Sequence, residues 1–131
     1  FKVQHVGVTS QESRKSWHRI RLSDRHFYAF LEHVGLTPVK SKTLGPLQIP
    51  DEVFPDFLRG CLDGDGTWYV KKEWGGRYQY LRAELCSASL RFLEWCRDTV
   101  TPLTGLQGSI CVASSHRAYN LVYNGREAIA L

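Results

Sequence analysis

A pair of adjacent glycines, Gly75 and Gly76, constrains the fold more than any other feature of the sequence. Glycine adopts positive φ without a steric cost, so two glycines between extended segments favour a tight hairpin turn. The flanking segments, 67–74 and 78–85, alternate apolar and polar residues, which is the pattern of half-buried strands. The sequence therefore predicts an antiparallel hairpin here, and with it a sheet of strands that are adjacent in sequence.

Two further hairpins and several helices complete the predicted order. Alternating segments predict strand pairs at 1–8 with 17–22 and at 109–113 with 119–123. Helical spacing and capping residues predict helices at 24–34, 51–64, 89–100 and after Asn124-Gly125. The order is ββα followed by αββαββα. This order predicts an α+β fold, with an antiparallel sheet that carries its helices on one face.

The segment 58–66, with the sequence LRGCLDGDG, places two glycines inside a predicted helix and ends that helix with Asp-Gly-Asp-Gly. Each helical glycine costs about 1 kcal/mol relative to alanine, but glycines four residues apart, such as Gly60 and Gly64, let two helices approach closely. Carboxylates beside the partly negative end of a helix are unfavourable unless a cation binds there. A hard divalent cation with oxygen ligands resolves the conflict, whereas the alternative is that 63–66 is a simple turn.

This segment resembles the LAGLIDADG motif of homing endonucleases, with Leu, Gly, Asp, Asp and the final Gly in register. The resemblance extends to the Lys- and Pro-rich connector before the motif, to Ile49-Pro50 and to 124–129, and it is weakest over residues 1–16. It implies a homing-endonuclease-like αββαββα fold. In that fold a saddle-shaped antiparallel sheet lies in the major groove of double-stranded DNA, and the helices pack on the other face.

The resemblance also implies metal-dependent hydrolysis of double-stranded DNA at a long target. Asp65 would be the catalytic carboxylate, and it would bind Mg²⁺ or another divalent cation together with the backbone carbonyl of Gly64. Lys40 is the best match to the family's catalytic basic residue and Lys42 the next, although both can also be solvated lysines of the connector. The motif helix would pack against that of a second half, through Phe57, Gly60, Cys61 and Gly64.

The DNA-binding face of the sheet follows from alternation, because side chains at i and i+2 share a face. We expect Trp68, Val70 and Trp74 to pack under the helices, together with Leu81, Ala83 and Leu85. The predicted DNA-contacting residues are those on the opposite face, at the turn and on the last hairpin: Tyr69, Lys71, Glu73, Arg77, Tyr80, Arg82, Glu84, His116, Arg117 and Asn120. Their side chains suit base edges and phosphates, although an ordinary solvated face has a similar composition.

The chain divides into two parts in this interpretation. Residues 1–48 resemble the tail of a preceding half, a partial ββα unit with its basic connector, and residues 49–131 form a half-domain with the motif. The family acts as a pair of halves, so the partner would be a second copy in a homodimer or a missing N-terminal portion. Two alternatives remain open: a non-cleaving nucleic-acid-binding protein, such as an RNA maturase or a regulator, and the endonuclease portion of an intein.

Composition agrees with these expectations without requiring them. The net charge of +4 favours a polyanionic partner. The four cysteines lack zinc-site spacing, so we expect reduced and mostly buried thiols. No stretch has the length and apolarity of a membrane span, and we expect no membrane partner and an intracellular location, either cytoplasmic or organellar.

Overall fold

The computed structural model describes residues 6–10 and 18–131, which fall into two compact units, 1–33 and 34–131. In the first unit, strand β1 (Val6–Ser10) pairs antiparallel with β2 (His18–Leu22), and helix α1 (Arg25–His33) follows. The predicted hairpin and helix are therefore present, while residues 1–5 and 17 of the prediction lie outside the described residues. Asp24 caps α1, because its Oδ1 accepts a hydrogen bond from the Phe27 N–H at 2.8 Å, and this bond lowers the pKa of Asp24.

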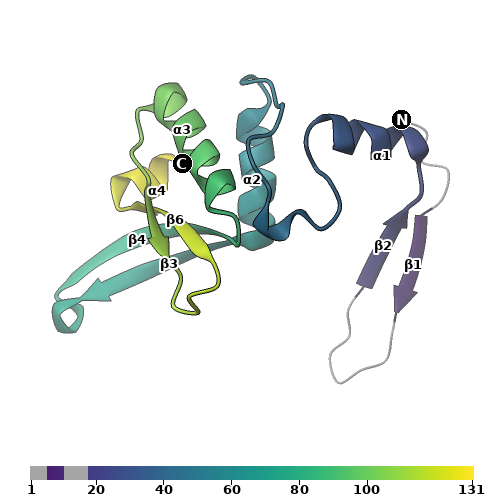
Figure 1. Ribbon diagram of the computed structural model, residues 1–131. Coiled ribbons are helices and arrows are strands. Elements are labelled where there is room, and N and C mark those ends of the chain that lie inside the picture. Colours follow the sequence, from purple (N-terminus) through teal and green to yellow (C-terminus); the bar gives the residue numbers. More distant parts are fainter. Residues whose placement is uncertain (1–5, 11–17) are drawn as a thin grey trace. The chain divides into compact units, whose positions relative to one another are not determined.

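The second unit contains a four-stranded antiparallel sheet in the order β3-β4-β6-β5. Its elements in chain order are η1 (Lys40–Lys42), α2 (Phe54–Asp65), β3 (Gly66–Glu73), η2 (Trp74–Gly76), β4 (Tyr78–Ser87), α3 (Leu90–Thr104), β5 (Ser109–Val112), β6 (Tyr119–Asn124) and α4 (Arg126–Ala130). In Figure 1, α2, α3 and α4 gather on one side of this sheet. The predicted α+β class and the predicted hairpins are confirmed.

The core of this unit lies between the helices and one face of the sheet. Helix α2 buries Phe54, Leu58 and Leu62, because residues at i, i+4 and i+8 share one face of a helix. The other buried apolar side chains of the core come mainly from α3 and from the two central strands: Phe92, Leu93, Cys96, Val100, Ala83, Leu85, Leu121 and Tyr123. Among the described residues, no helix is both long enough and apolar enough to cross a bilayer.

Helix α3 continues to Thr104, beyond its predicted end at Val100. Pro102 lies within its last turn, where the missing N–H leaves one carbonyl of the preceding turn without its helical donor. The side-chain hydroxyls of Thr101 and Thr104 bind the carbonyls of Arg97 and Val100 and reinforce this turn. The helix stops instead at Gly105, whose φ of 77° is the left-handed conformation of a C-terminal cap.

The connector before α2 belongs to the second unit, so that this unit begins at Val34 rather than at residue 49. Leu47 is buried in the core, and the Gln48 N–H donates to the carbonyl of Val34 at 3.0 Å. The buried hydroxyl of Ser89, at the start of α3, donates to the carbonyl of Leu44. Apolar residues spaced along the connector therefore hold it against the core, although its prolines exclude a long helix or strand.

The hairpin of β3 and β4 extends past the helices (Figure 1). The prediction that Val70 and Trp74 pack under the helices is wrong, because these side chains are 55% and 80% exposed, and Trp68 is only partly covered at 45%. Ala83 and Leu85 are buried as expected. Alternation identified the face correctly, but the face is covered only where α2, α3 and α4 reach it.

Candidate functional site

The C-terminal end of α2 carries the acidic part of the glycine-rich segment. Asp63, Gly64 and Asp65 are exposed, and the helix ends where Gly66 becomes extended. A Cβ atom on Gly66 would lie within 3 Å of the backbone of Leu62, so this position requires glycine. The close approach turns the chain directly from α2 into β3, and it leaves two carboxylates beside the carbonyls of the helix end.

A groove of about 440 Å³ brings two of the predicted catalytic residues together. Asp65 of α2 and the half-buried Lys40 of η1 both line it, as do Cys61 and Cys86, whereas Lys42 is exposed and does not. We call this the Lys40 groove. The turn η1 begins after Val39, which has a φ of 58°. A 3₁₀ turn rotates successive residues by about 120°, so Lys40 and Lys42, two residues apart, leave it on different sides. In such a groove the lysine can contact a phosphate oxygen, while the carboxylate can bind a metal ion that contacts the same phosphodiester.

The four residues predicted to form a helix interface do not share one environment. Gly60 and Gly64 are exposed, and a Cβ atom on either would meet no described atom within 4 Å. Phe57 instead packs against Phe92 and Trp95, with ring centroids 6.4 and 5.8 Å away. Cys61 is partly buried, and burial raises the pKa of its thiol, as does the charge of Asp65. Gly60 and Gly64 therefore form an open strip on α2, while Phe57 and Cys61 are partly buried next to the core.

The open face of the sheet is organised around the carboxylate of Glu84. Tyr69 donates its hydroxyl to Oε1 at 2.9 Å, and Asn120 donates Nδ2 to Oε2 at 3.2 Å. Arg82 Nε lies 2.6 Å from Oε1 as an ion pair, although its N–H is not aligned for a hydrogen bond to any described atom. Burial, the largest single influence, would lower the pKa of Arg82, but the charge of Glu84 together with the interactions of Tyr69 and Tyr80 raises that pKa overall. Four of the predicted DNA-contacting side chains thus form a mutually oriented cluster.

A second cluster lies further along the same face. The hydroxyl of Tyr80 donates to Glu73 Oε1 at 2.9 Å, and Lys71 Nζ lies 3.5 Å from that oxygen. The predicted residues at the ends of the hairpins are exposed: Arg77 after η2, and His116 and Arg117 between β5 and β6. Strand register explains this arrangement, since Lys71 is opposite Tyr80 and Tyr69 is opposite Arg82. Sequence alternation therefore identified the face of β3 and β4 that carries these polar side chains.

Several exposed residues near this face were missed from the sequence. Trp74, Tyr78 and Lys72 lie on the uncovered end of the β3–β4 hairpin. Cys86 and Cys111 are exposed in register with Asn120, so the expectation of mostly buried thiols is wrong for these two. The signal for the cysteines was their alternation with Leu85 and Ile110. The signal for Trp74 was its place beside Gly75 in the turn, where helices rarely cover a side chain.

The oxygen donors at the end of α2 suit a hard divalent cation, but they are few. The carboxylate of Asp65 and the carbonyl of Gly64 are the ligand types that Mg²⁺ prefers. Among the described residues, no group of three or more His, Cys, Asp or Glu side chains is arranged to hold a metal ion. These two donors alone do not fill the coordination of such a cation, so any ion bound here would take its other ligands from outside these residues.

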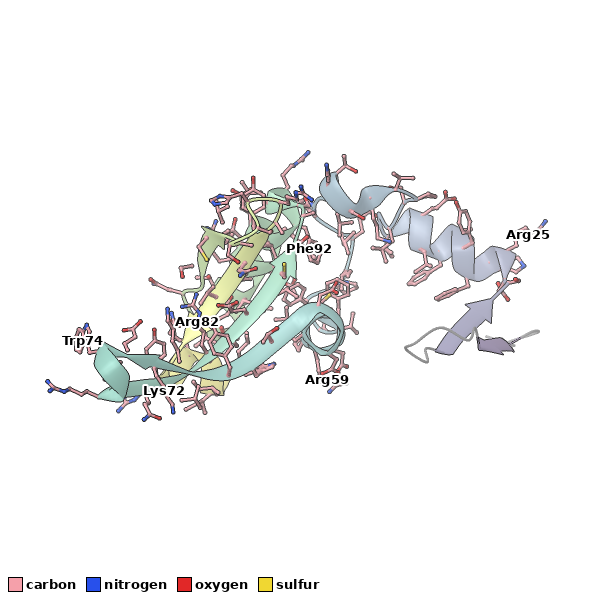
Figure 2. All side chains as sticks on the ribbon, turned by 90° about the horizontal axis from the view of Figure 1, so that it is seen from below. Arg25, Arg59, Lys72, Trp74, Arg82 and Phe92 are labelled. Carbon is pink, nitrogen blue, oxygen red and sulfur yellow. The ribbon has the colours of Figure 1, made fainter. Side chains whose placement is uncertain are left out.

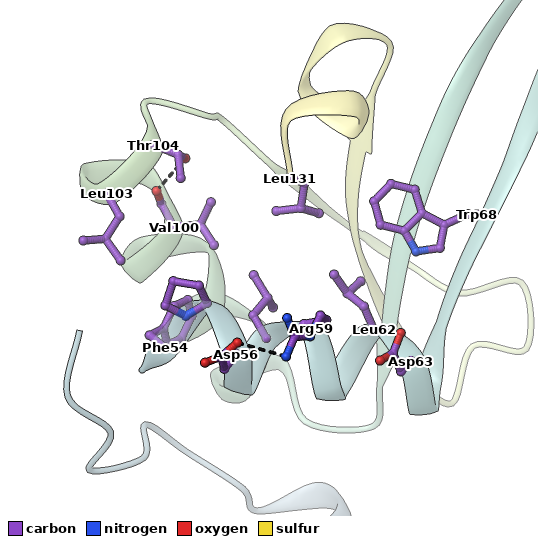
Figure 3. Close-up of a pocket in the computed structure, with 12 residues that line it drawn as sticks. Phe54, Asp56, Arg59, Leu62, Asp63, Trp68, Val100, Leu103, Thr104 and Leu131 are labelled. Carbon is purple, nitrogen blue, oxygen red and sulfur yellow. Dashed lines mark hydrogen bonds and ion pairs between the residues drawn. The ribbon is translucent and has the colours of Figure 1, made fainter. Parts of the chain in front are cut away.

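A second groove, of about 340 Å³, lies on the other side of α2 (Figure 3). Leu62, Val100, Leu103 and Leu131 give it an apolar floor, and Trp68 stands at one end. Its charged rim includes Asp56 and Arg59, which pair with each other at 3.0 Å. This groove lacks free cations for a phosphate among its described lining residues, so it is the weaker candidate for a nucleic-acid site.

Comparison of the chain with protein-family models and with curated protein sequences found no match. The functional interpretation therefore rests on the residues and on their geometry.

Proposed function

We propose that this chain is one half of a LAGLIDADG-type homing endonuclease, which hydrolyses double-stranded DNA at a long recognition site. The observation that carries the proposal is the Lys40 groove, where the segment LRGCLDGDG ends α2 with Asp65 on the same groove as Lys40. The groove also includes Cys86, which belongs to the open face of the sheet through its register with Asn120. Candidate reacting groups and a polar sheet face are therefore continuous.

In this proposal Asp65 and the carbonyl of Gly64 hold Mg²⁺ or another divalent cation at the end of α2. Such a cation supplies an activated water and stabilises the charge that develops on the scissile phosphate. Lys40 neutralises a phosphate oxygen from the side of the connector. The carboxylate of Asp65 is exposed, so a phosphodiester can reach it without any rearrangement of the core.

A second half completes the site in this proposal. The open glycine strip of Gly60 and Gly64 can accept a partner helix at short distance, because no described atom would contact a Cβ atom at either position. The partner is either a second copy of this chain or an N-terminal portion with its own motif helix. A homodimer would read a near-palindromic target, since a two-fold protein matches a two-fold sequence. We place this DNA-directed activity inside the cell, in the cytoplasm or an organelle.

The second candidate is a non-cleaving nucleic-acid-binding protein, such as an RNA maturase or a regulator. It is supported by the same open face together with the small number of metal-ligand side chains among the described residues. An endonuclease portion of an intein would share the cleavage chemistry of the first candidate. Cleavage distinguishes the binding protein from both nucleases.

The test is cleavage of a randomised duplex library by the chain, alone and with a second half supplied, in the presence and absence of Mg²⁺. The Asp65→Asn variant is compared with Asp63→Asn, which removes the same charge from an exposed position two residues away. We expect Asp65→Asn to lower the cleavage rate by at least about 100-fold, and Asp63→Asn to retain most of it.

Metal-dependent cleavage that survives Asp65→Asn would contradict the proposed role of Asp65. Binding of duplex DNA without a cleaved product, in the presence of a second half, would favour the non-cleaving protein. The matched pair Lys40→Met and Lys42→Met then tests the connector, and we expect the larger loss for Lys40, because Lys40 lines the groove with Asp65.

A further inference from the structure

The outer end of the β3–β4 hairpin carries a row of aromatic side chains, Trp74, Tyr78 and Tyr80, which we call the aromatic tip. The ring centroids of Trp74 and Tyr78 are 6.3 Å apart, and those of Tyr78 and Tyr80 are 5.5 Å apart. Trp74 is 80% exposed and Tyr78 is 54% exposed. Figure 2 shows Trp74 at the far end of the hairpin, beyond Lys72 and Arg82.

The tip is not explained by packing, since the largest ring in it is also its most exposed. Trp74 has a φ of 49°, and Gly75 and Gly76 follow with φ of 68° and 87°. Asparagine or glycine fits the left-handed region with less strain than tryptophan, and outliers of this kind concentrate at functional positions. The turn therefore presents an indole to solvent at a cost in local conformation, without a gain in burial.

Three cationic residues flank the aromatic tip in the sequence and in the strand register. Lys71 is opposite Tyr80 in the strand register, Lys72 is opposite Gln79, and Arg77 precedes Tyr78. The carboxylate of Glu73 is already engaged, because it accepts the Tyr80 hydroxyl and pairs with Lys71. Lys72 and Arg77 are both exposed, Lys72 two residues before Trp74 in the chain and Arg77 directly before Tyr78. A flat aromatic surface flanked by cations complements a base attached to phosphates better than it complements an apolar protein segment.

We propose that the aromatic tip binds single-stranded nucleic acid by stacking an unpaired base on Trp74, with adjacent phosphates on Lys72 and Arg77. Bases within a duplex cover each other's faces, so that only an unpaired base offers a free face to the indole. The inference goes beyond the proposed cleavage of duplex DNA, because it requires no metal ion and no second half. It assigns a function to Trp74 and Lys72, which lie outside the predicted DNA-contacting set.

The test measures binding of the intact chain to a single-stranded oligonucleotide that contains 2-aminopurine, in buffer with EDTA. We expect binding to quench the 2-aminopurine fluorescence, and we expect Trp74→Ala to weaken affinity by about 5- to 150-fold, the effect of losing one stacked base. Trp74→Phe keeps a ring and should retain most of the affinity. Tyr28→Ala, at an exposed aromatic residue of α1, is the matched control and should leave the affinity unchanged.

Two further measurements separate binding from folding and from simple charge attraction. Trp74→Gly suits the left-handed backbone, so we expect it to unfold no more readily than the parent chain while it binds as weakly as Trp74→Ala. Lys72→Ser combined with Arg77→Ser should reduce the slope of log K against log salt by about 0.7 for each phosphate that is no longer neutralised. A duplex closed by loops at both ends of its stem, with the loops made of abasic linkers, should compete poorly.

The proposal is overturned if Trp74→Ala and Tyr28→Ala bind alike, or if the closed duplex competes as well as the single strand. It is also overturned if Trp74→Ala changes only the self-association of the chain in sedimentation, which would make the tip an interface between copies. None of these outcomes depends on cleavage, because EDTA removes divalent cations throughout. Failure of the proposed nuclease and failure of this inference are therefore distinguishable.

Discussion

The two faces of the four-stranded sheet are built from the same strands but meet different demands. On β4, Ala83 and Leu85 are buried under the helices, while Arg82 and Glu84, which alternate with them, lie on the open face. The covered face gains its stability from apolar area removed from water. The open face has polar groups that contact one another, as Tyr69 does at Glu84 through a hydrogen bond and Arg82 through an ion pair. The comparison teaches that one face stabilises the fold while the other holds side chains in fixed positions.

The largest effect is expected from a cavity on the covered face. Leu121 of β6 is 1% exposed in the core, and Leu121→Ala should lower the free energy of unfolding by about 2–5 kcal/mol. Chemical denaturation followed by circular dichroism measures this loss. Val70→Ala is the matched control, since Val70 points to the same side of the sheet but is 55% exposed, and it should change stability by less than about 1 kcal/mol. Equal losses for the two would show that the helices cover the outer hairpin as well.

A smaller effect is expected from titration of Tyr123, a polar group on the covered face. Burial raises the pKa of Tyr123 from 10.0 to about 12, so the unfolded chain loses this proton at lower pH than the folded chain does. The stabilisation is present below pH 10 and is lost as the pH rises towards 12, by about 2–3 kcal/mol over this window. Burial also raises the pKa of the Cys96 thiol, which adds a loss of the same sign.

Denaturation curves of the parent and of Tyr123→Phe between pH 8 and 11 measure this effect. The Tyr123 hydroxyl is buried without a hydrogen-bond partner in the described part of the chain, so at pH 8 the variant should be equal or more stable by up to about 1 kcal/mol. Its stability should also fall less steeply above pH 10. A fall as steep as that of the parent would assign the alkaline loss to other groups.

The smallest effect on stability is expected on the open face, from Glu84→Gln. The variant keeps an acceptor for Tyr69 but loses the charge that orients Arg82, which should cost about 1–2 kcal/mol. We expect the loss of this negative charge to strengthen non-specific binding of duplex DNA and to weaken discrimination between targets. Binding isotherms on a random and a selected duplex measure both changes. Unchanged affinity for both would mean that this face does not meet DNA.

Sequence patterns predicted the parts of the fold that depend on local geometry. Gly75 and Gly76 identified the hairpin, Asp24 identified a helix start, and alternation along β4 separated Arg82 from Ala83. The extent of helix cover over Val70 was not predictable, because it depends on where elements distant in sequence end. Helices often end before or near a proline, but this one continues through Pro102 to a glycine cap.

For the candidate site, the sequence indicated which kinds of residue take part, and the structure shows which of them lie on the same groove. The pattern Asp-Gly-Asp-Gly indicated a helix end with two carboxylates, and the structure adds which of them lines the Lys40 groove. The resemblance ranked Lys40 before Lys42, and in the structure Lys40 lines the groove whereas Lys42 does not, because residues two apart in the turn η1 point to different sides. Trp74 was assigned to the wrong environment, since alternation carries no information about where a covering layer stops.

The bonds that tie the connector to the core set the place where this chain can be divided. Ser89 donates a hydrogen bond to Leu44, and Gln48 donates one to Val34. The connector with Lys40 is therefore attached to the same unit as Asp65, and both residues line one groove. If the chain is divided between His33 and Val34, Lys40 and Asp65 stay together in one fragment. A division at residue 48 would separate them and strip Leu47 from the core. When half-domains are exchanged between proteins, residues 34–131 are therefore the segment to transfer as a unit.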